Sequence, residues 1–129
     1  MLDFATLTGA VVITLGHIAT GIMSNNETLV ENIKVSSDNT GEHVWQLPLW
    51  DEYCDQVQSE VADVKNLGSP GQAGTIAGGA FLKAFVGKDI PWAHFDVAGT
   101  SYHVENRSYI QKNSASGQVI RLVLDMLGA

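Results

Sequence analysis

Near the N-terminus stands Leu2-Asp3-Phe4-Ala5-Thr6-Leu7-Thr8-Gly9-Ala10, which reads as a short strand entering a tight turn of small residues. Residues 2–6 favour a strand, whereas residues 8–10 end it where bulky side chains would clash. In an α/β sheet, ligands bind in the loop after the carboxyl end of a strand. A turn containing Gly9 offers backbone N–H and C=O groups with little side chain in the way. Composition alone favours the alternative, an ordinary strand-to-helix corner that needs glycine for its dihedral angles.

Strand-like and helix-like stretches alternate through the rest of the chain. Further strands are predicted at residues 19–24, 43–50, 60–64 and 91–99. Helices are predicted at residues 10–16, 27–40, 51–59, 75–86 and 119–127. This alternation favours a layered α/β sheet in a single domain, with no internal repeat and no interdomain linker.

Two of the predicted helices carry further signals. Asn26 precedes the helix at residues 27–40 as a cap, and the spacing turns Leu29, Val30 and Ile33 inward, with Val35 as a fourth candidate. The pair at residues 78–79, Gly-Gly, lies inside the helix at residues 75–86, where glycine lowers helix stability. We therefore expect another backbone to pack closely there.

Composition and charge narrow the classes of function. The chain has 129 residues with a net charge of −7, which argues against nucleic-acid and anionic-membrane partners. It has no run of about 18 apolar residues that would span a bilayer. The lone cysteine, Cys54, excludes an intramolecular disulfide and fits a reducing cytosol, so we expect a cytoplasmic protein.

Two stretches contain residue types that can bind phosphate groups or metal ions. Residues 68–74 are rich in glycine and precede a helix, but they match neither the dinucleotide nor the Walker A pattern, so a plain loop is the better reading. His94 and Asp96 share one face of a predicted strand and could hold a metal ion or a catalytic hydrogen bond. One such pair is a weak signal, and a structural hydrogen bond is the favoured reading.

Two further pairs are acid–base candidates. These are Glu60 with Asp63, and His103 with Glu105. Neither pair has a spacing that singles it out, so these residues alone name no reaction.

Ordered blocks along nearly the whole chain resemble the leucyl (cytosol) aminopeptidase family. They are Ala-Thr-Leu-Thr-Gly-Ala at residues 5–10, Gly-Glu-x-Val-Trp-x-Leu-Pro-Leu at 41–49, Ser-x-x-Ala-Asp-x-x-Asn-x-Gly at 59–68, Gly-x-x-Phe-Leu-x-x-Phe-Val at 78–86, and Trp-Ala-His-Phe-Asp-Val-Ala-Gly at 92–99. The resemblance implies an α/β/α layered fold with a mixed, mostly parallel sheet, as an incomplete part of a zinc-exopeptidase-like catalytic domain. Residues 1–129 would form the C-terminal portion of that domain.

The family's activity is removal of N-terminal residues, leucine and similar ones, from peptides by two divalent ions, Mn or Zn. The resemblance places the metal ligands and catalytic side chains in segments upstream of these blocks, so it implies no metal ligand and no catalytic side chain in this chain. It implies as partners a peptide substrate, the N-terminal part of the enzyme, and further copies in a hexamer.

Six residues match the substrate-binding positions of the family. The resemblance implies that the Leu7 N–H binds the scissile carbonyl or its oxyanion, and that the Gly9 carbonyl takes a proton from the substrate. The pocket for the N-terminal side chain would be lined by Thr6, Gly9, Ala98 and Ser101, and the neighbouring pocket by Leu67.

Two hypotheses about function follow. In the first, the chain is part of a two-metal aminopeptidase and is inactive alone. In the second, it is a stand-alone, non-catalytic paralogue that binds peptides or aminopeptidase subunits.

Overall fold

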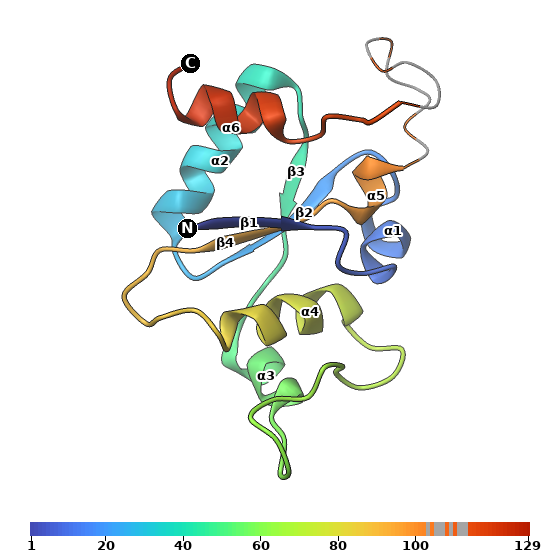
Figure 1. The fold of residues 1–129 in the computed structure, drawn as a ribbon, viewed down its shortest axis with the longest axis vertical. Coiled ribbons are helices and arrows are strands. Elements are labelled where there is room, and N and C mark those ends of the chain that lie inside the picture. The colour runs from blue at the N-terminus through green and yellow to red at the C-terminus, as the bar shows by residue number, and fades with distance from the viewer. Residues whose placement is uncertain (103, 105–107, 109, 111–113) are drawn as a thin grey trace.

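The computed structural model describes residues 1–102, 104, 108, 110 and 114–129 (Figure 1). Its sheet has four strands in the order β1-β4-β2-β3. Their bounds are Leu2–Ala5 for β1, Thr20–Ser24 for β2, Val44–Gln46 for β3 and Ala93–Asp96 for β4. The strand β4, last in the sequence, therefore lies inside the sheet between β1 and β2.

The strand directions confirm the predicted mixed, mostly parallel sheet. β1 runs parallel to β4, and β2 runs parallel to β3. The third pair, β2 with β4, is antiparallel and joins the two parallel pairs.

The helices form layers on both faces of this sheet, as the predicted α/β/α arrangement requires. Figure 1 shows α2 and α6 over one face, α4 and α3 on the other, and α1 and α5 beyond one end. The helical segments are α1 (Ala10–Leu15), α2 (Glu27–Thr40), α3 (Asp51–Cys54), the short 3-10 helix η1 (Asp55–Val57), α4 (Gly74–Lys83), α5 (Ala98–Ser101) and α6 (Ile120–Met126). In the part of the chain described, no helix has the length and apolarity needed to cross a membrane.

The main core lies between the sheet and the α2–α6 layer. Phe95 of β4 is fully buried there, together with Ile22 of β2, Ile33 of α2 and Leu122 of α6. Burying a side chain of this size stabilises the fold by about 1.5–3 kcal/mol. Since side chains alternate along a strand, the residues on either side of Phe95 face the opposite, α4-covered side of the sheet.

The helix α2 confirms the boundaries expected from its caps. The Asn26 side chain accepts a hydrogen bond from the Leu29 N–H at 2.8 Å, and Gly41 ends the helix in the left-handed region at φ 69°. Val30 and Ile33 are buried as predicted, whereas Val35 is 59% exposed, so the inward placement of Val35 was wrong.

The predicted strand at residues 60–64 was also wrong. The segment forms bends outside the sheet, and Val61 is 95% exposed. The alternating pattern is not sufficient for a strand, because no described strand pairs with this segment. The polar residues 102–114 favour an irregular loop by composition, and most of these positions lie outside the described residues.

Close packing at residues 78–79 is confirmed, but the neighbours are side chains rather than a backbone. A Cβ atom on Gly79 would lie 2.4 Å from the sulfur of Met23, and one on Gly78 would lie 2.9 Å from the methyl group of Thr8. The two glycines thus let α4 approach β2 and the turn after β1.

Candidate functional site

The turn after β1 and the helix α5 lie at the same end of the sheet because β1 and β4 are parallel neighbours (Figure 1). Ala5, the last residue of β1, pairs with Asp96, the last residue of β4. The Ala5 carbonyl also accepts a hydrogen bond from the Val97 N–H at 2.9 Å. This register brings the predicted site residues of the turn close to those of α5.

The carboxylate of Asp96 joins these two segments. Asp96 is fully buried, and its Oδ1 accepts hydrogen bonds from the N–H groups of Leu7 at 3.1 Å and Ala98 at 3.2 Å. Its Oδ2 accepts from the Thr8 N–H at 3.1 Å and the Thr8 hydroxyl at 2.7 Å. A buried carboxylate needs such donors to offset its lost hydration.

The predicted binding of a substrate oxygen by the Leu7 N–H stays a prediction, and in this structure the group makes a contact within the protein. The Leu7 N–H donates to Asp96, and this bond holds the turn in place. The Gly9 carbonyl accepts the Val12 N–H at 3.2 Å in the first turn of α1. A carbonyl has two lone pairs, so this bond leaves Gly9 one further acceptor position.

A cavity of about 910 Å³ opens beside the turn. Leu7 and Thr8 line it from the turn, residues 66–74 line it from the loop before α4, and Ile76 and Phe81 line it from α4 itself. The structure thus brings together Leu7 and Leu67, two predicted site residues that are distant in sequence. The glycine-rich loop at residues 68–74 forms a wall of this cavity.

The other four predicted site residues are placed around the same strand ends. Thr6 and Gly9 are exposed on the turn that contains Leu7, whereas Ala98 and Ser101 are half-buried in α5. None of these four lines the 910 Å³ cavity. Their assignment to one substrate pocket stays a prediction.

Close contact with the end of α1 fixes α5. A Cβ atom on Gly99 would lie 2.2 Å from the Gly16 carbonyl oxygen, so only glycine fits there. His17, which follows Gly16, bonds the Gly99 carbonyl through Nδ1 at 2.6 Å. This histidine therefore has the helix-end role that is usual for its position.

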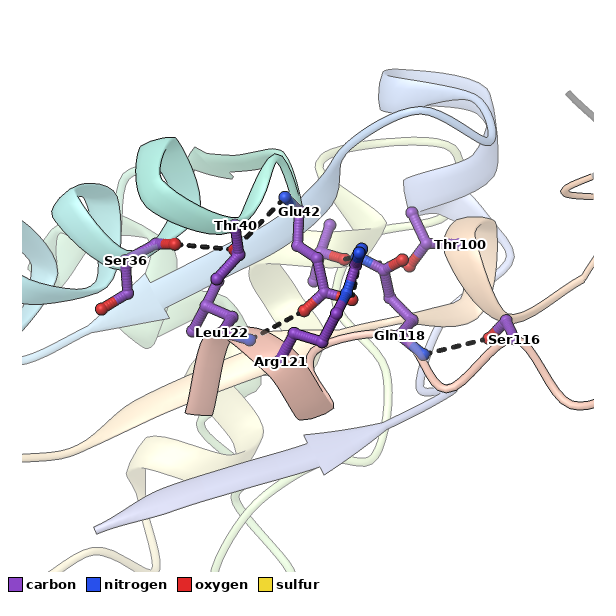
Figure 2. Close-up of polar contacts among 9 residues, drawn as sticks. Ser36, Thr40, Glu42, Thr100, Ser116, Gln118, Arg121 and Leu122 are labelled. Atoms are coloured by element: carbon purple, nitrogen blue, oxygen red, sulfur yellow. Dashed lines mark hydrogen bonds and ion pairs between the residues drawn. The ribbon is translucent and has the colours of Figure 1, made fainter. Parts of the chain in front are cut away.

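A buried hydroxyl pair holds α5 from the sheet side. The hydroxyls of Thr100 in α5 and Thr20 in β2 are 2.9 Å apart, and Gln118 donates to Thr20 at 3.5 Å (Figure 2). In the same view the fully buried Glu42 accepts a hydrogen bond from the Leu122 N–H at 2.9 Å and lies 3.5 Å from the Arg121 guanidinium. These contacts join α6 to the segment between α2 and β3.

His94 and Asp96 share one face of β4, as predicted, but they serve separate contacts. Nδ1 of the fully buried His94 bonds the carboxylate of Asp3 in β1, whose other oxygen accepts the indole N–H of Trp92. The favoured reading of a structural hydrogen bond is thus confirmed for both side chains.

The remaining acid–base candidates gain no support from the structure. Glu60 and Asp63 are exposed in the bends after η1, outside the cavity lining. His103 and Glu105 lie outside the described residues. Within residues 1–102, 104, 108, 110 and 114–129, no three His, Cys, Asp or Glu side chains group as metal ligands.

Sequence reasoning missed Thr8 and Thr75 at this site. The Thr8 hydroxyl gives its hydrogen to Asp96, so the Thr75 hydroxyl, 3.2 Å away at the start of α4, donates to Thr8. The Thr8 oxygen also accepts the Val11 N–H at 3.2 Å. The available signal was a threonine in the turn and an aspartate at a strand end, two types that form such bonds with backbone groups.

Comparison with known proteins identifies the family to which this chain belongs. Residues 1–124 match the model of the cytosol aminopeptidase family, catalytic domain. A probable cytosol aminopeptidase of Geobacter sp. (strain M21) is 49% identical over 127 residues, covering 98% of this chain and 25% of that protein. One from Geobacter sulfurreducens (strain ATCC 51573 / DSM 12127 / PCA) is 46% identical over 129 residues, covering 100% and 25%. The chain thus spans about a quarter of the length of these relatives.

The solved structures give the same result. A mutant of tomato leucine aminopeptidase superposes with a TM-score of 0.86 at 33% identity, covering 98% of this chain and 24% of that one. The fold and the turn after β1 define an α/β protein with a candidate site at its strand ends. The chain belongs to the cytosol aminopeptidase family and matches part of its catalytic domain.

Proposed function

We propose that this chain is the C-terminal portion of the catalytic domain of a cytoplasmic aminopeptidase that removes leucine and similar N-terminal residues from peptides. The observation that carries the proposal is the meeting of Leu7 and Leu67 at one cavity, beside the carboxyl ends of β1 and β4. An apolar cavity at this place suits the side chains of a peptide.

The proposed role of the chain is to bind and orient the substrate. Leu67 borders the pocket for the residue after the scissile bond, and Leu7 contributes its side chain to the same wall. We assign the N-terminal side chain of the peptide to Thr6, Gly9, Ala98 and Ser101. The spare acceptor position of the Gly9 carbonyl remains available to a substrate N–H.

The two divalent ions proposed for the reaction, Mn or Zn, would need carboxylates with free oxygens, and the two carboxylates beside the strand ends already have partners. Asp96 is fully engaged by four donors, and Asp3 is engaged by His94 and Trp92. We therefore propose that the two ions and their ligands belong to another part of the enzyme, which would assemble as a hexamer through its catalytic domain.

A chimaera tests the proposal. Residues 1–129 replace the matching segment of the Geobacter sp. (strain M21) protein, and release of leucine from a leucyl anilide is measured with Mn²⁺ or Zn²⁺. We expect hydrolysis by the chimaera and none by the 129-residue chain alone. A folded but inactive chimaera beside an active parent would contradict the proposal and favour a non-catalytic, peptide- or subunit-binding paralogue.

One substitution tests the cavity within that chimaera. Leu67→Ala is expected to lower kcat/KM for leucyl-leucine by about tenfold relative to leucyl-glycine, since apolar contacts with the second residue are lost. Val61→Ala is the matched control, because Val61 is similarly exposed but does not line the cavity. An equal effect of Leu67→Ala on both dipeptides would remove Leu67 from the pocket.

A further inference from the structure

We propose that Asp96 is a positioning residue, whose buried carboxylate fixes the turn after β1 relative to the start of α5, the two walls of the pocket proposed above for the N-terminal side chain. The inference rests on the proposed function, because it concerns the same pocket. Asp96 itself does not line the cavity. It acts through the backbone of residues 7–8 on one side and Ala98 on the other.

The hydrogen-bond pattern separates this role from that of an ordinary buried acid. Each carboxylate oxygen accepts two donors, and Oδ1 binds both walls at once, through the N–H groups of Leu7 and Ala98. Oδ2 binds Thr8 twice. All four donors are neutral, and the described residues pair no lysine or arginine with this carboxylate. Among the described residues, the negative charge is therefore stabilised by donors of the turn and of α5.

The hydroxyl of Thr8 extends the hydrogen-bond network to Thr75 of α4, which lines the 910 Å³ cavity. It donates to Asp96 and accepts from Thr75, in the first turn of α4, and from the Val11 N–H of α1. The turn, α1, α4 and α5 thus share one hydrogen-bonded unit centred on Asp96. A change at this carboxylate is therefore expected to displace the turn, α4 and α5 together. The change removes no atom that touches the substrate in this proposal.

The first experiment uses the chimaera with the variant Asp96→Asn. An amide has one accepting oxygen, so its NH₂ group must face two of the four donors. The readout is the ratio of kcat/KM for a leucyl anilide to that for a glycyl anilide, in which the fraction of folded enzyme cancels. We expect this ratio to fall by about tenfold, because displaced walls no longer fit the larger side chain.

A second pair of variants guards against loss of folding. Thr8→Val keeps the shape of the side chain and removes its hydroxyl, whereas Thr8→Ser keeps the hydroxyl. We expect Thr8→Val to lower the ratio by about fivefold and Thr8→Ser to restore most of it. Asp125→Asn is the control, since Asp125 bonds Asn39 on the far α2–α6 layer and is expected to leave the ratio unchanged.

Hydrogen exchange supplies a readout that does not need activity. In Asp96→Asn or Thr8→Val, the amides of residues 6–9 and 97–101 should both exchange faster, while those of residues 20–24 in β2 keep their rates. Unchanged substrate ratios in an active chimaera, or exchange that rises on only one wall, would overturn the inference. An inactive unsubstituted chimaera would instead refute the proposed function, and hydrogen exchange would then decide the inference alone.

Discussion

Gly99 shows how a single residue without a side chain shapes the pocket. It lies where α5 meets the end of α1, and its backbone approaches the Gly16 carbonyl too closely for any Cβ atom. Ala98 and Ser101, the α5 residues assigned to the pocket, therefore depend on Gly99 for their position. The residue is needed for a contact rather than for an unusual backbone angle.

We predict that Gly99→Ala lowers the free energy of unfolding by about 3 kcal/mol, because the added methyl group would overlap a backbone oxygen that has no room to move. The measurement is urea unfolding of the chain followed by circular dichroism. Gly9→Ala is the matched control for stability: a Cβ atom there meets nothing within 4 Å and φ is −67°, so a change below about 0.5 kcal/mol is expected. Equal stability of both variants would contradict the close approach.

At the scale of single residues, the sequence predicted that two residues lie close together but did not predict their hydrogen-bond partners. Leu7 and Leu67 were predicted from the resemblance and do meet at one cavity. The hydrogen bond from the Leu7 N–H to Asp96 could not be predicted, because Asp96 is 89 positions away in the sequence. Hydrogen-bond partners of this kind are set by the sheet register, which a single sequence does not contain.

The helix α6 depends on a contact with Glu42, a residue outside the helix. It has seven residues, and the described contacts show no side-chain cap from the preceding Val119, which adopts a left-handed φ of 66°. The carboxylate of Glu42 supplies the missing acceptor at the Leu122 N–H (Figure 2). An acidic group near a helix N-terminus also interacts favourably with the helix dipole.

We predict that Glu42→Gln lowers the free energy of unfolding by about 1–3 kcal/mol, because a charge-assisted buried hydrogen bond becomes a neutral one and the Arg121 contact weakens. Urea unfolding measures the change. Glu31→Gln, an exposed substitution on α2, serves as the control and is expected to change stability by less than about 0.5 kcal/mol. If the two variants were equally stable, Glu42 would not anchor α6.

Element boundaries were predictable where local signals act within the element. The caps of α2 at Asn26 and Gly41 are of this kind, since each needs only its own neighbours in sequence. The failed strand at residues 60–64 had a suitable alternating pattern, but a strand needs a partner, and the sheet offers none there. The residue pattern therefore predicted the helix α2 more reliably than the strand at residues 60–64.

For the whole molecule, β1 forms an open edge of the sheet. Among the described residues, β1 pairs with β4 alone, and Phe4, which stacks on Phe95 at a centroid distance of 4.7 Å, remains 41% exposed. Unpaired strand edges with apolar side chains promote pairing with other chains. The class of fold was predictable from alternating elements, whereas the strand order was not, because it depends on contacts distant in sequence.

We predict that the 129-residue chain self-associates at micromolar concentration through the β1 edge. Sedimentation velocity of Phe4→Lys should give a mass closer to 13.8 kDa, since a charge at an edge opposes strand addition. Val35→Lys makes the same change on an exposed position of α2 and should leave association unaltered. A monomeric unsubstituted chain would contradict the prediction.

The position of β4 inside the sheet also has a consequence for how the chain folds. Asp3 and His94, which bond across the β1–β4 pair, are 91 positions apart in sequence. During synthesis, β2 and β3 can pair early, but the β1–β4 pair cannot form until β4 has emerged from the ribosome. Folding with such distant contacts is slow, and the waiting strand is exposed to other chains for that time. A chaperone that binds nascent chains would therefore protect this sequence most before residue 96 is made.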